Sequence, residues 1–203
     1  MRPRPYLSHS QKKLWKKSPK EYLAKYIFDK KQFVTKEMKF GSVMASALEE
    51  DELTGDVLLD TVMMEIPKFD LMDHVSEAVL KVGKEVVPLF GRMDTRREDH
   101  SAFKEYKTGK DGKGGWTQKK VDEDSQITFY ATMCYILTKK IPDDIELVWI
   151  ITENDPDDGR AIVCTGEIRR FKTYRNIGQI INEMADMRKV WNEIGVACEK
   201  ELL

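Results

Sequence analysis

The sequence is poor in the residues that build cysteine- or histidine-based metal sites. It has only three cysteines and three histidines in 203 residues, and both kinds are scattered singly. Zinc sites and iron–sulfur clusters need several such ligands at close spacing, often as Cys-x-x-Cys pairs, and no such pair occurs. A zinc site of this kind and a cysteine-held iron–sulfur cluster are therefore not expected. The cysteines are interpreted as core or free thiols: Cys134, Cys164 and Cys198.

Long apolar runs are also missing. No segment approaches the roughly 20 consecutive apolar residues of a membrane-spanning helix. The first residues, Met-Arg-Pro-Arg-Pro-Tyr, are not followed by an apolar segment of the kind found in signal peptides. With 41% hydrophobic and 34% charged residues, the chain has the composition of a soluble globular protein. We expect a cytoplasmic protein without membrane contact.

The net charge of −1 hides a strong asymmetry along the chain. Residues 1–40 hold twelve Lys/Arg and three Asp/Glu, whereas residues 41–73 hold one Lys and nine Asp/Glu. A basic N-terminal segment fits a polyanion such as DNA, and Lys12 and Lys16 are candidate contacts to a duplex backbone. The alternative is that these lysines only face water, as most charge runs do.

Local signals divide the first half of the chain into helices. Ser8 and Ser18 each begin a capping box, so two short helices are expected within residues 8–31. A third helix is expected over residues 37–52, because apolar residues recur there at helical spacing. Residues 54–74 are compatible with either helix or turn.

The period then changes to two, which is typical of strands. Strands are expected at 75–81, 86–94 and 102–108, and short polar or Gly-containing turns separate them as in an antiparallel meander. A helix at 121–139 follows. Strands at 145–152 and 161–171 flank a hairpin loop at 154–159, and a long helix occupies 176–200. This order predicts one α/β domain over residues 1–203 with a mixed sheet. Its parts are 1–53 (basic helices and third helix), 75–173 (sheet and helix) and 174–203 (C-terminal helix).

One acidic triplet stands out among four of the form Asp/Glu-x-Lys. Only Glu105-Tyr106-Lys107 lies on an expected central strand, where Glu105 and Lys107 share a face. A hairpin would bring Asp94, at the end of the preceding strand, beside them. Two carboxylates can hold a hard cation, and a lysine can stabilise charge that builds on a phosphate. The alternative is an ordinary cross-strand ion pair.

Several segments in order resemble the PD-(D/E)XK nuclease superfamily, in particular its RecB-like, phage-type exonuclease branch. "YLSHSQKKLWKKSPKEYLAKYI" is similar to the N-terminal segment of the branch, "FGSVMASALEE" to its first motif and "LFGRMD" to its second. "FKEYKTGK" is similar to the third motif, and "QITFY" to the Gln-x-x-x-Tyr motif. The resemblance covers about residues 6–152.

The resemblance implies a restriction-endonuclease-like core, with an αβββαβ order, and metal-dependent cleavage of DNA. Mg²⁺ or Mn²⁺ would be the cofactor, with Asp94 and Glu105 as ligands and Glu49 near the metal. Lys107 would position or activate the attacking water. Gln126 and Tyr130 would support Lys107 or contact DNA; the alternative is that they only pack their helix on the sheet.

Two departures from the family pattern bear on the metal site. Ala45 stands where many relatives have a histidine ligand, which weakens the case for a second metal. The absence of cluster-binding cysteines places the chain among members without an iron–sulfur cluster.

The resemblance favours an exonuclease of DNA recombination, repair or phage metabolism, and a phage or host recombination protein is a further expected partner. The rival hypothesis is a catalytically inactive nuclease fold that binds DNA or protein. Digestion polarity, strand preference and oligomeric state remain open.

A Gly-rich basic loop over residues 109–120 combines charge with an aromatic ring. Such a mixture suits single-stranded DNA, because phosphates pair with the ammonium groups and a base can stack on the ring. The equally weighted alternative is a solvated insertion whose tryptophan packs down. The candidate DNA-binding residues of this loop are Lys110, Lys113, Trp116, Lys119 and Lys120.

Overall fold

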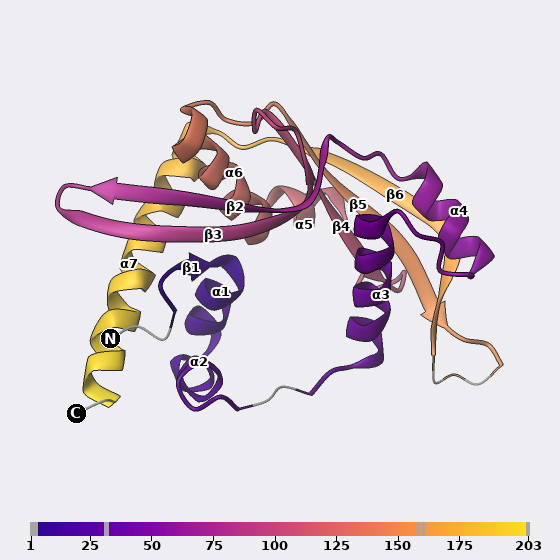
Figure 1. Cartoon of the computed structure of the whole chain (residues 1–203), viewed down its shortest axis with the longest axis horizontal. Coiled ribbons are helices and arrows are strands. Elements are labelled where there is room, and N and C mark those ends of the chain that lie inside the picture. The colour runs from indigo at the N-terminus through magenta and orange to yellow at the C-terminus, as the bar shows by residue number, and fades with distance from the viewer. Residues whose placement is uncertain (1–3, 31–32, 158, 160, 202–203) are drawn as a thin grey trace.

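The computed structural model describes residues 4–30, 33–157, 159 and 161–201. These residues form a mixed six-stranded sheet with helices on both faces (Figure 1). The strands are β1 (Leu7–Ser8), β2 (Leu71–Val82), β3 (Glu85–Arg96), β4 (Ala102–Gly109), β5 (Asp144–Asn154) and β6 (Ile162–Thr173). The helices are α1 (His9–Lys17), α2 (Pro19–Tyr26), α3 (Lys36–Glu50), α4 (Val57–Glu65), α5 (Gln118–Asp122), α6 (Ser125–Thr138) and α7 (Ile177–Glu201).

The strand order confirms the predicted fold class and the predicted meander. β2, β3 and β4 follow one another as antiparallel neighbours, β4 and β5 are parallel, and β5 and β6 are antiparallel. A parallel pair needs a crossover connection, which α5 and α6 supply between β4 and β5. β1 was not predicted, because two residues are too short to show a period.

β3 and β4 separate soon after the turn that joins them. β2 pairs along almost the whole of one edge of β3, so β1 and β4 share the other edge. β4 pairs only with Thr95 and Arg96, and β1 pairs only with Leu89 and Phe90. Neither β1 nor β4 pairs with residues 91–94 of β3. These residues therefore border a gap between β3 and β4. In Figure 1 the β2–β3 hairpin extends away from β4, β5 and β6.

Side-chain alternation along the strands divides the core into two layers. Phe103 of β4 and Trp149 of β5 face the layer that includes residues of α1, α2, α6 and α7. Tyr106 of β4 and Val148 of β5 face the opposite layer, which α3 and α4 cover. Glu105 and Lys107 alternate with Tyr106 and therefore start from the α6 side of the sheet.

Several predicted boundaries need correction. The helix expected over 121–139 is two helices, α5 and α6, because Asp124 caps α6: its Oδ1 accepts hydrogen bonds from the backbone amides of Gln126 and Ile127. β2 begins at Leu71 rather than 75, and β3 continues past 94 to Arg96.

The segment 54–74, which the sequence left open between helix and turn, contains α4. The 154–159 loop does join β5 and β6, although position 158 lies outside the described residues.

The two short N-terminal helices are confirmed as α1 and α2, with Ser8 and Ser18 as their caps. The helix predicted at 37–52 is α3, which begins at Lys36 and ends at Glu50. The last helix is α7. No helix among the described residues is long and apolar enough to span a membrane.

Candidate active site

The gap between β3 and β4 brings Asp94 and Glu105 together as the motifs predict. Asp94 Oδ2 accepts a hydrogen bond from the backbone amide of Tyr106 at 2.6 Å. That carboxylate thus replaces the strand partner that the Tyr106 amide lacks where β3 and β4 separate. Glu105 is only 2% exposed, so its carboxylate lies inside the protein behind the gap.

Lys107 and Gln126 surround one oxygen of Glu105. Lys107 Nζ donates to Glu105 Oε1 at 2.6 Å and to Gln126 Oε1 at 3.0 Å. Gln126 Nε2 donates to the same Glu105 Oε1 at 2.5 Å. The glutamine amide therefore joins the carboxylate and the ammonium in a closed ring of hydrogen bonds, and both its oxygen and its nitrogen are used.

Tyr130 lies one turn along α6 from Gln126 and is buried behind it. Gln126 Nε2 also donates to the Tyr130 hydroxyl at 3.2 Å. The tyrosine ring reaches this place because Gly91 of β3 has no side chain: a Cβ there would lie 3.0 Å from the ring. Of the two predicted roles for Gln126, this geometry supports the one in which it holds Lys107.

Burial and neighbouring charge shift the pKa values of all three ionisable groups. Burial, and then the nearby Asp94 carboxylate, raise the pKa of Glu105 to about 8. Burial also raises the pKa of Asp94. Burial alone would lower the pKa of Lys107, but the carboxylates of Glu105 and Asp94 outweigh it and raise the pKa. Lys107 is therefore an ammonium at neutral pH.

A cavity of about 380 Å³ opens on the other side of these groups, between β4 and α3. Glu49 of α3 lines this cavity together with Asp94 and Glu105. The predicted Glu49 therefore lies near the two carboxylates, and its side chain is exposed. Ala45 also lines it.

Asp73 of β2 is a further carboxylate on this cavity that the sequence did not reveal. It forms an ion pair with Arg92 at 2.9 Å. Burial raises the pKa of Asp73, the nearby Arg92 lowers it, and the facing Glu49 raises it further. Asp73 lies in the strand that precedes "LFGRMD", and that position was the one clue to it. It was missed because the strand was expected to begin at residue 75, two residues after Asp73.

The donor set fits a divalent cation. Glu105 Oε2 is buried and has no hydrogen-bond partner, which is costly for a carboxylate oxygen unless a cation or a proton satisfies it. The carboxylates of Asp94 and Glu105 supply the hard oxygen ligands that Mg²⁺ and Mn²⁺ prefer. No group of three or more His, Cys, Asp or Glu side chains suited to a metal occurs among the residues that the structure describes. Water or substrate would therefore complete the coordination.

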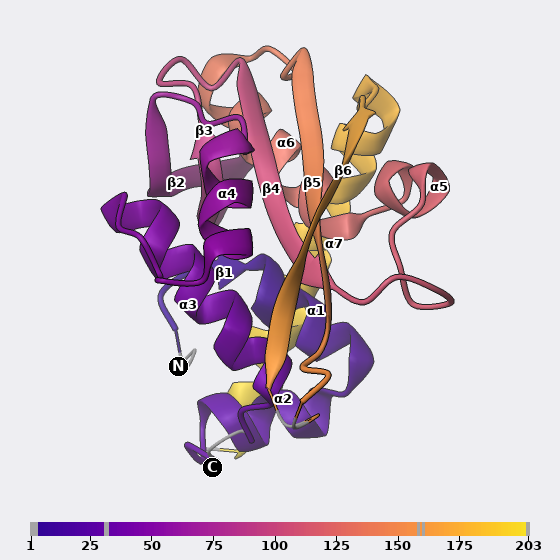
Figure 2. The ribbon, with the colours of Figure 1, turned by 90° about the vertical axis from the view of Figure 1, so that its right-hand side faces the viewer.

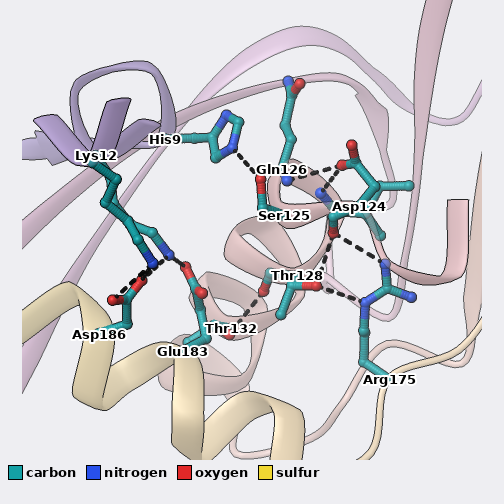
Figure 3. Close-up of polar contacts among 12 residues, drawn as sticks. His9, Lys12, Asp124, Ser125, Gln126, Thr128, Thr132, Arg175, Glu183 and Asp186 are labelled. Carbon is teal, nitrogen blue, oxygen red and sulfur yellow. Dashed lines mark hydrogen bonds and ion pairs between the residues drawn. The ribbon is translucent and has the colours of Figure 1, made fainter. Parts of the chain in front are cut away.

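Polar contacts fix the N-terminal end of α6 (Figure 3). Asp124 caps the helix, and its backbone carbonyl accepts from Arg175 Nη2 at 3.2 Å and from the Thr128 hydroxyl at 2.9 Å. Arg175 Nε donates to Thr128 Oγ1 at 2.8 Å. On the other side, His9 Nε2 and Ser125 Oγ lie 3.0 Å apart. Sequence reasoning missed Arg175, because a lone arginine between a strand and a helix carries no motif.

The prediction that Lys12 contacts DNA is wrong. Lys12 is 3% exposed, and its ammonium lies between Glu183 and Asp186 of α7 (Figure 3). The helical pattern gives no sign of these acidic partners, which come from the other end of the chain. Lys16 is more exposed and also pairs with Asp186, at 3.0 Å, so its role toward DNA stays a prediction.

The 109–120 loop is tied to the fold more than its composition suggests. Trp116 is partly buried and packs against the core, as the alternative hypothesis expects. Lys110 Nζ donates to Asn154 at 2.8 Å, and Lys120 Nζ donates to the carbonyl of Gly115 at 2.6 Å. Lys119, like Lys120, belongs to α5 rather than to the loop, and both are exposed, as is Lys113. DNA binding by these residues stays a prediction.

A second cavity of about 610 Å³ lies on the α6 side of the gap, between α1 and β3. Its wall includes Gln126 and Tyr130, so it adjoins the carboxylate site. Tyr6 stacks on Phe90 in this wall with ring centroids 4.6 Å apart. Four cationic side chains also line the cavity: Arg4, Lys13, Lys25 and Arg92.

No family model matches the sequence, and no curated protein matches it either. Two solved structures share its fold. A candidate exonuclease from Eubacterium rectale matches with a TM-score of 0.55 at 11% identity, covering 93% of this chain and 79% of that one. A phage-related exonuclease from Haemophilus somnus matches with a TM-score of 0.53 at 12% identity, covering 90% and 83%. The expected architecture is confirmed by this likeness: the chain shares the mixed α/β fold of these two structures.

Proposed function

We propose that this protein is a metal-dependent nuclease that hydrolyses phosphodiester bonds in DNA, and that it acts as an exonuclease. The observation that carries the proposal is the buried Glu105 carboxylate, with one oxygen held by Lys107 and Gln126 and the other without a partner. A carboxylate in this state is suited to a cation on one side and to an orienting ammonium on the other.

A bound Mg²⁺ or Mn²⁺ would polarise the scissile phosphate and lower the pKa of a coordinated water. Asp94 and Glu105 are the residues that would hold it, and Glu49 and Asp73 lie on the wall of the same cavity. In this hydrolysis the water oxygen would form the new bond to phosphorus and release its proton to solvent. The bond from phosphorus to the leaving oxygen would break, and that oxygen would take up a proton from solvent.

Lys107 contributes a fixed positive charge rather than a base. Glu105 and Asp94 keep it protonated, and Glu105 and Gln126 hold its nitrogen in place. An ammonium in this position can orient the attacking water by a hydrogen bond and stabilise negative charge on the phosphate. Gln126 keeps that ammonium oriented, and Tyr130 supports Gln126 from behind.

The distribution of charge favours approach of the substrate from the α1 side. The 610 Å³ cavity there is lined by four cationic side chains and by the stacked rings of Tyr6 and Phe90. Phosphates and unpaired bases of a DNA strand are suited to such a wall. The α3 side instead carries the acidic segment 41–73, which repels phosphate. A strand that enters from the basic side would meet Gln126 and Tyr130 before the carboxylates.

The alternative, a nuclease fold that only binds DNA or protein, is less well supported. Buried carboxylates at a phosphate site repel the substrate unless a cation lies between them, so binding alone gives no reason to keep Asp94 and Glu105 there.

The test is digestion of end-labelled linear single- and double-stranded DNA with Mg²⁺, Mn²⁺ or EDTA. A covalently closed circle of the same sequence separates exonuclease from endonuclease activity. We expect metal-dependent loss of label from the linear DNA that Lys107→Met abolishes and that the exposed control Lys189→Met retains. No digestion by the folded wild-type protein in either metal, with DNA binding intact, would favour the binding module instead.

A further inference from the structure

The helix α4 is apolar on the face that meets solvent as well as on the face that meets the core. Leu59, Val62 and Met63 are buried against β4, β5 and β6 residues of the second core layer. On the opposite side, Val57 is 77% exposed, Leu58 51% and Met64 74%. A surface helix ordinarily carries polar side chains on its outer face, so this helix has an apolar outer face without a cover among the described residues.

A small cavity continues this apolar face toward the loop that precedes α4. It has a volume of about 280 Å³ and is lined by Leu53, Met63 and Met64. Leu53 is 74% exposed at its rim. The rest of the lining is charged: Asp51, Glu52, Asp60 and Lys68. Its size and lining suit one large apolar side chain, with carboxylates beside the entrance.

The surroundings of this face are mainly acidic, although Lys68 also lines the cavity. Residues 41–67 contain seven acidic side chains and no lysine, arginine or histidine. Some of these carboxylates have local structural roles: Asp56 caps α4, and Asp60 accepts hydrogen bonds from Thr54 and Gly55. Within the described part of the chain, no ion pair involves Glu50, Glu52 or Glu65, whereas Asp51 pairs with Lys68 at 2.7 Å.

We propose that the α4 face, formed by Leu53, Val57, Leu58 and Met64, binds a basic amphipathic segment of another protein. An apolar side chain of that segment would enter the 280 Å³ cavity, and its lysines or arginines would meet Glu50, Glu52 and Glu65. Apolar anchors supply most of the affinity in such helix-in-groove contacts, and complementary charge selects the partner.

This surface is separate from the proposed catalytic groups. No residue of α4 lines the 380 Å³ cavity that contains Asp94 and Glu105. Figure 1 and Figure 2 show α4 on the outer side of the sheet, and it packs mainly against β6. Because the face is acidic, DNA is not its ligand, and a protein bound there would leave the basic cavity on the α1 side free. The inference therefore stands whether or not the protein is a nuclease.

The experiment uses the full chain and two fluorescein-labelled 18-residue peptides. One carries leucine and lysine at amphipathic helical spacing, and the other replaces each lysine by glutamate. We expect fluorescence anisotropy to show saturable binding of the Leu/Lys peptide only. Leu53→Glu and Met64→Glu should each weaken that binding about tenfold or more, which corresponds to about 1.4 kcal/mol or more for a lost anchor contact. Ile181→Glu, an exposed apolar position on α7, is the matched control and should bind as the wild type does.

All three substitutions are at exposed positions, so circular dichroism and thermal melting should show folded proteins. Equal binding by the wild type, Leu53→Glu and Met64→Glu would overturn the proposal, as would the absence of saturable binding. Sedimentation of the free protein tests the rival occupant. A self-association that Met64→Glu abolishes would assign this face to a second copy of the chain and would also overturn the proposal.

Discussion

Gln126 holds Lys107 by a hydrogen bond of 3.0 Å from the lysine ammonium to the glutamine Oε1, across the gap between α6 and β4. Its Nε2 at the same time donates to Glu105, which is the second partner of that ammonium. Lys107 therefore has two fixed acceptors, and only one of them is a charged group. This arrangement makes the orientation of Lys107 depend on a residue outside the Glu-x-Lys triplet.

Replacing Gln126 by Met should slow DNA cleavage by about 100-fold, because loss of orientation at a reacting centre typically costs a factor of that order. The side chain keeps its length but loses all three of its hydrogen bonds, to Lys107, Glu105 and Tyr130. DNA affinity in EDTA should change little, since no charge is removed. Single-turnover cleavage and anisotropy measure the two quantities.

Gln118→Met on α5 is the control, because Gln118 contacts Asp122 and the Lys172 carbonyl, away from the carboxylates. A Gln126→Met protein that cleaves at the wild-type rate would show that Glu105 alone is enough to orient Lys107.

The sequence predicted the central part of this site because each motif carries its own local signal. Glu105 and Lys107 share a strand face by alternation, and Gln126 and Tyr130 share a helix face by their spacing of four. The order of the strands then placed Asp94 beside Glu105. Periodicity and one hairpin thus placed Asp94, Glu105 and Lys107 together, whereas only the family resemblance linked Gln126 and Tyr130 to them.

Other features depend on contacts between distant parts of the chain, which no local pattern reveals. In the sequence, Lys12 resembles a solvated helical lysine. In the structure it is buried against Glu183 and Asp186 of α7. Asp73 faces Glu49 only because β2 lies next to β3 and α3 covers that end of the sheet. The gap between β3 and β4 likewise follows from strand pairing, because β4 pairs only with Thr95 and Arg96 of β3.

The stability of the metal-free protein should fall as the pH rises from about 5 to 8. Glu105 has a folded-state pKa of about 8 and an unfolded value of 4.5. Between these values the folded state retains a proton that the unfolded state releases, so the free energy of unfolding decreases with pH. Each pH unit in this window corresponds to at most about 1.4 kcal/mol from this group.

Glu105→Gln removes this dependence, because a neutral side chain has no proton to lose. In EDTA, the melting temperature of the variant should therefore exceed that of the wild type increasingly from pH 5 to pH 8. Mn²⁺ at pH 8 should raise the melting temperature of the wild type more than that of the variant, since a ligand that binds only the folded state stabilises it. The same pH profile for both proteins in EDTA would contradict the assignment of the pKa to Glu105.

Lys12→Met should destabilise the protein by about 3–5 kcal/mol, the usual cost of removing one partner of a buried ion pair. Glu183 and Asp186 would then face each other without the cation that joins α1 to α7. Urea unfolding measures the change. Lys16→Met is a matched control on the same helix: its side chain is 55% exposed, so losing its pair with Asp186 should cost about 1 kcal/mol or less. Similar losses in both variants would mean that burial does not distinguish the two lysines.

Arg175→Lys should slow cleavage by acting through α6 rather than through the substrate. The guanidinium of Arg175 donates to the carbonyls of Val121 and Asp124 and to the hydroxyls of Thr128 and Thr173. A lysine ammonium has three donors and no planar fork, so it cannot satisfy these acceptors together. The cap of α6 then loosens and Gln126 moves with it, which should lower the cleavage rate about tenfold with little change in DNA affinity.

A double-mutant cycle separates this positioning role from a general loss of stability. If Arg175 acts through Gln126, then Arg175→Lys in a Gln126→Met background should lower the melting temperature but leave the already reduced cleavage rate almost unchanged. The cleavage rates of all four proteins are measured at a temperature where circular dichroism shows each of them folded. Rate losses that multiply in the double variant would mean that the two side chains act independently. In that case the contacts of Arg175 at the α5–α6 junction would stabilise the fold without orienting Lys107.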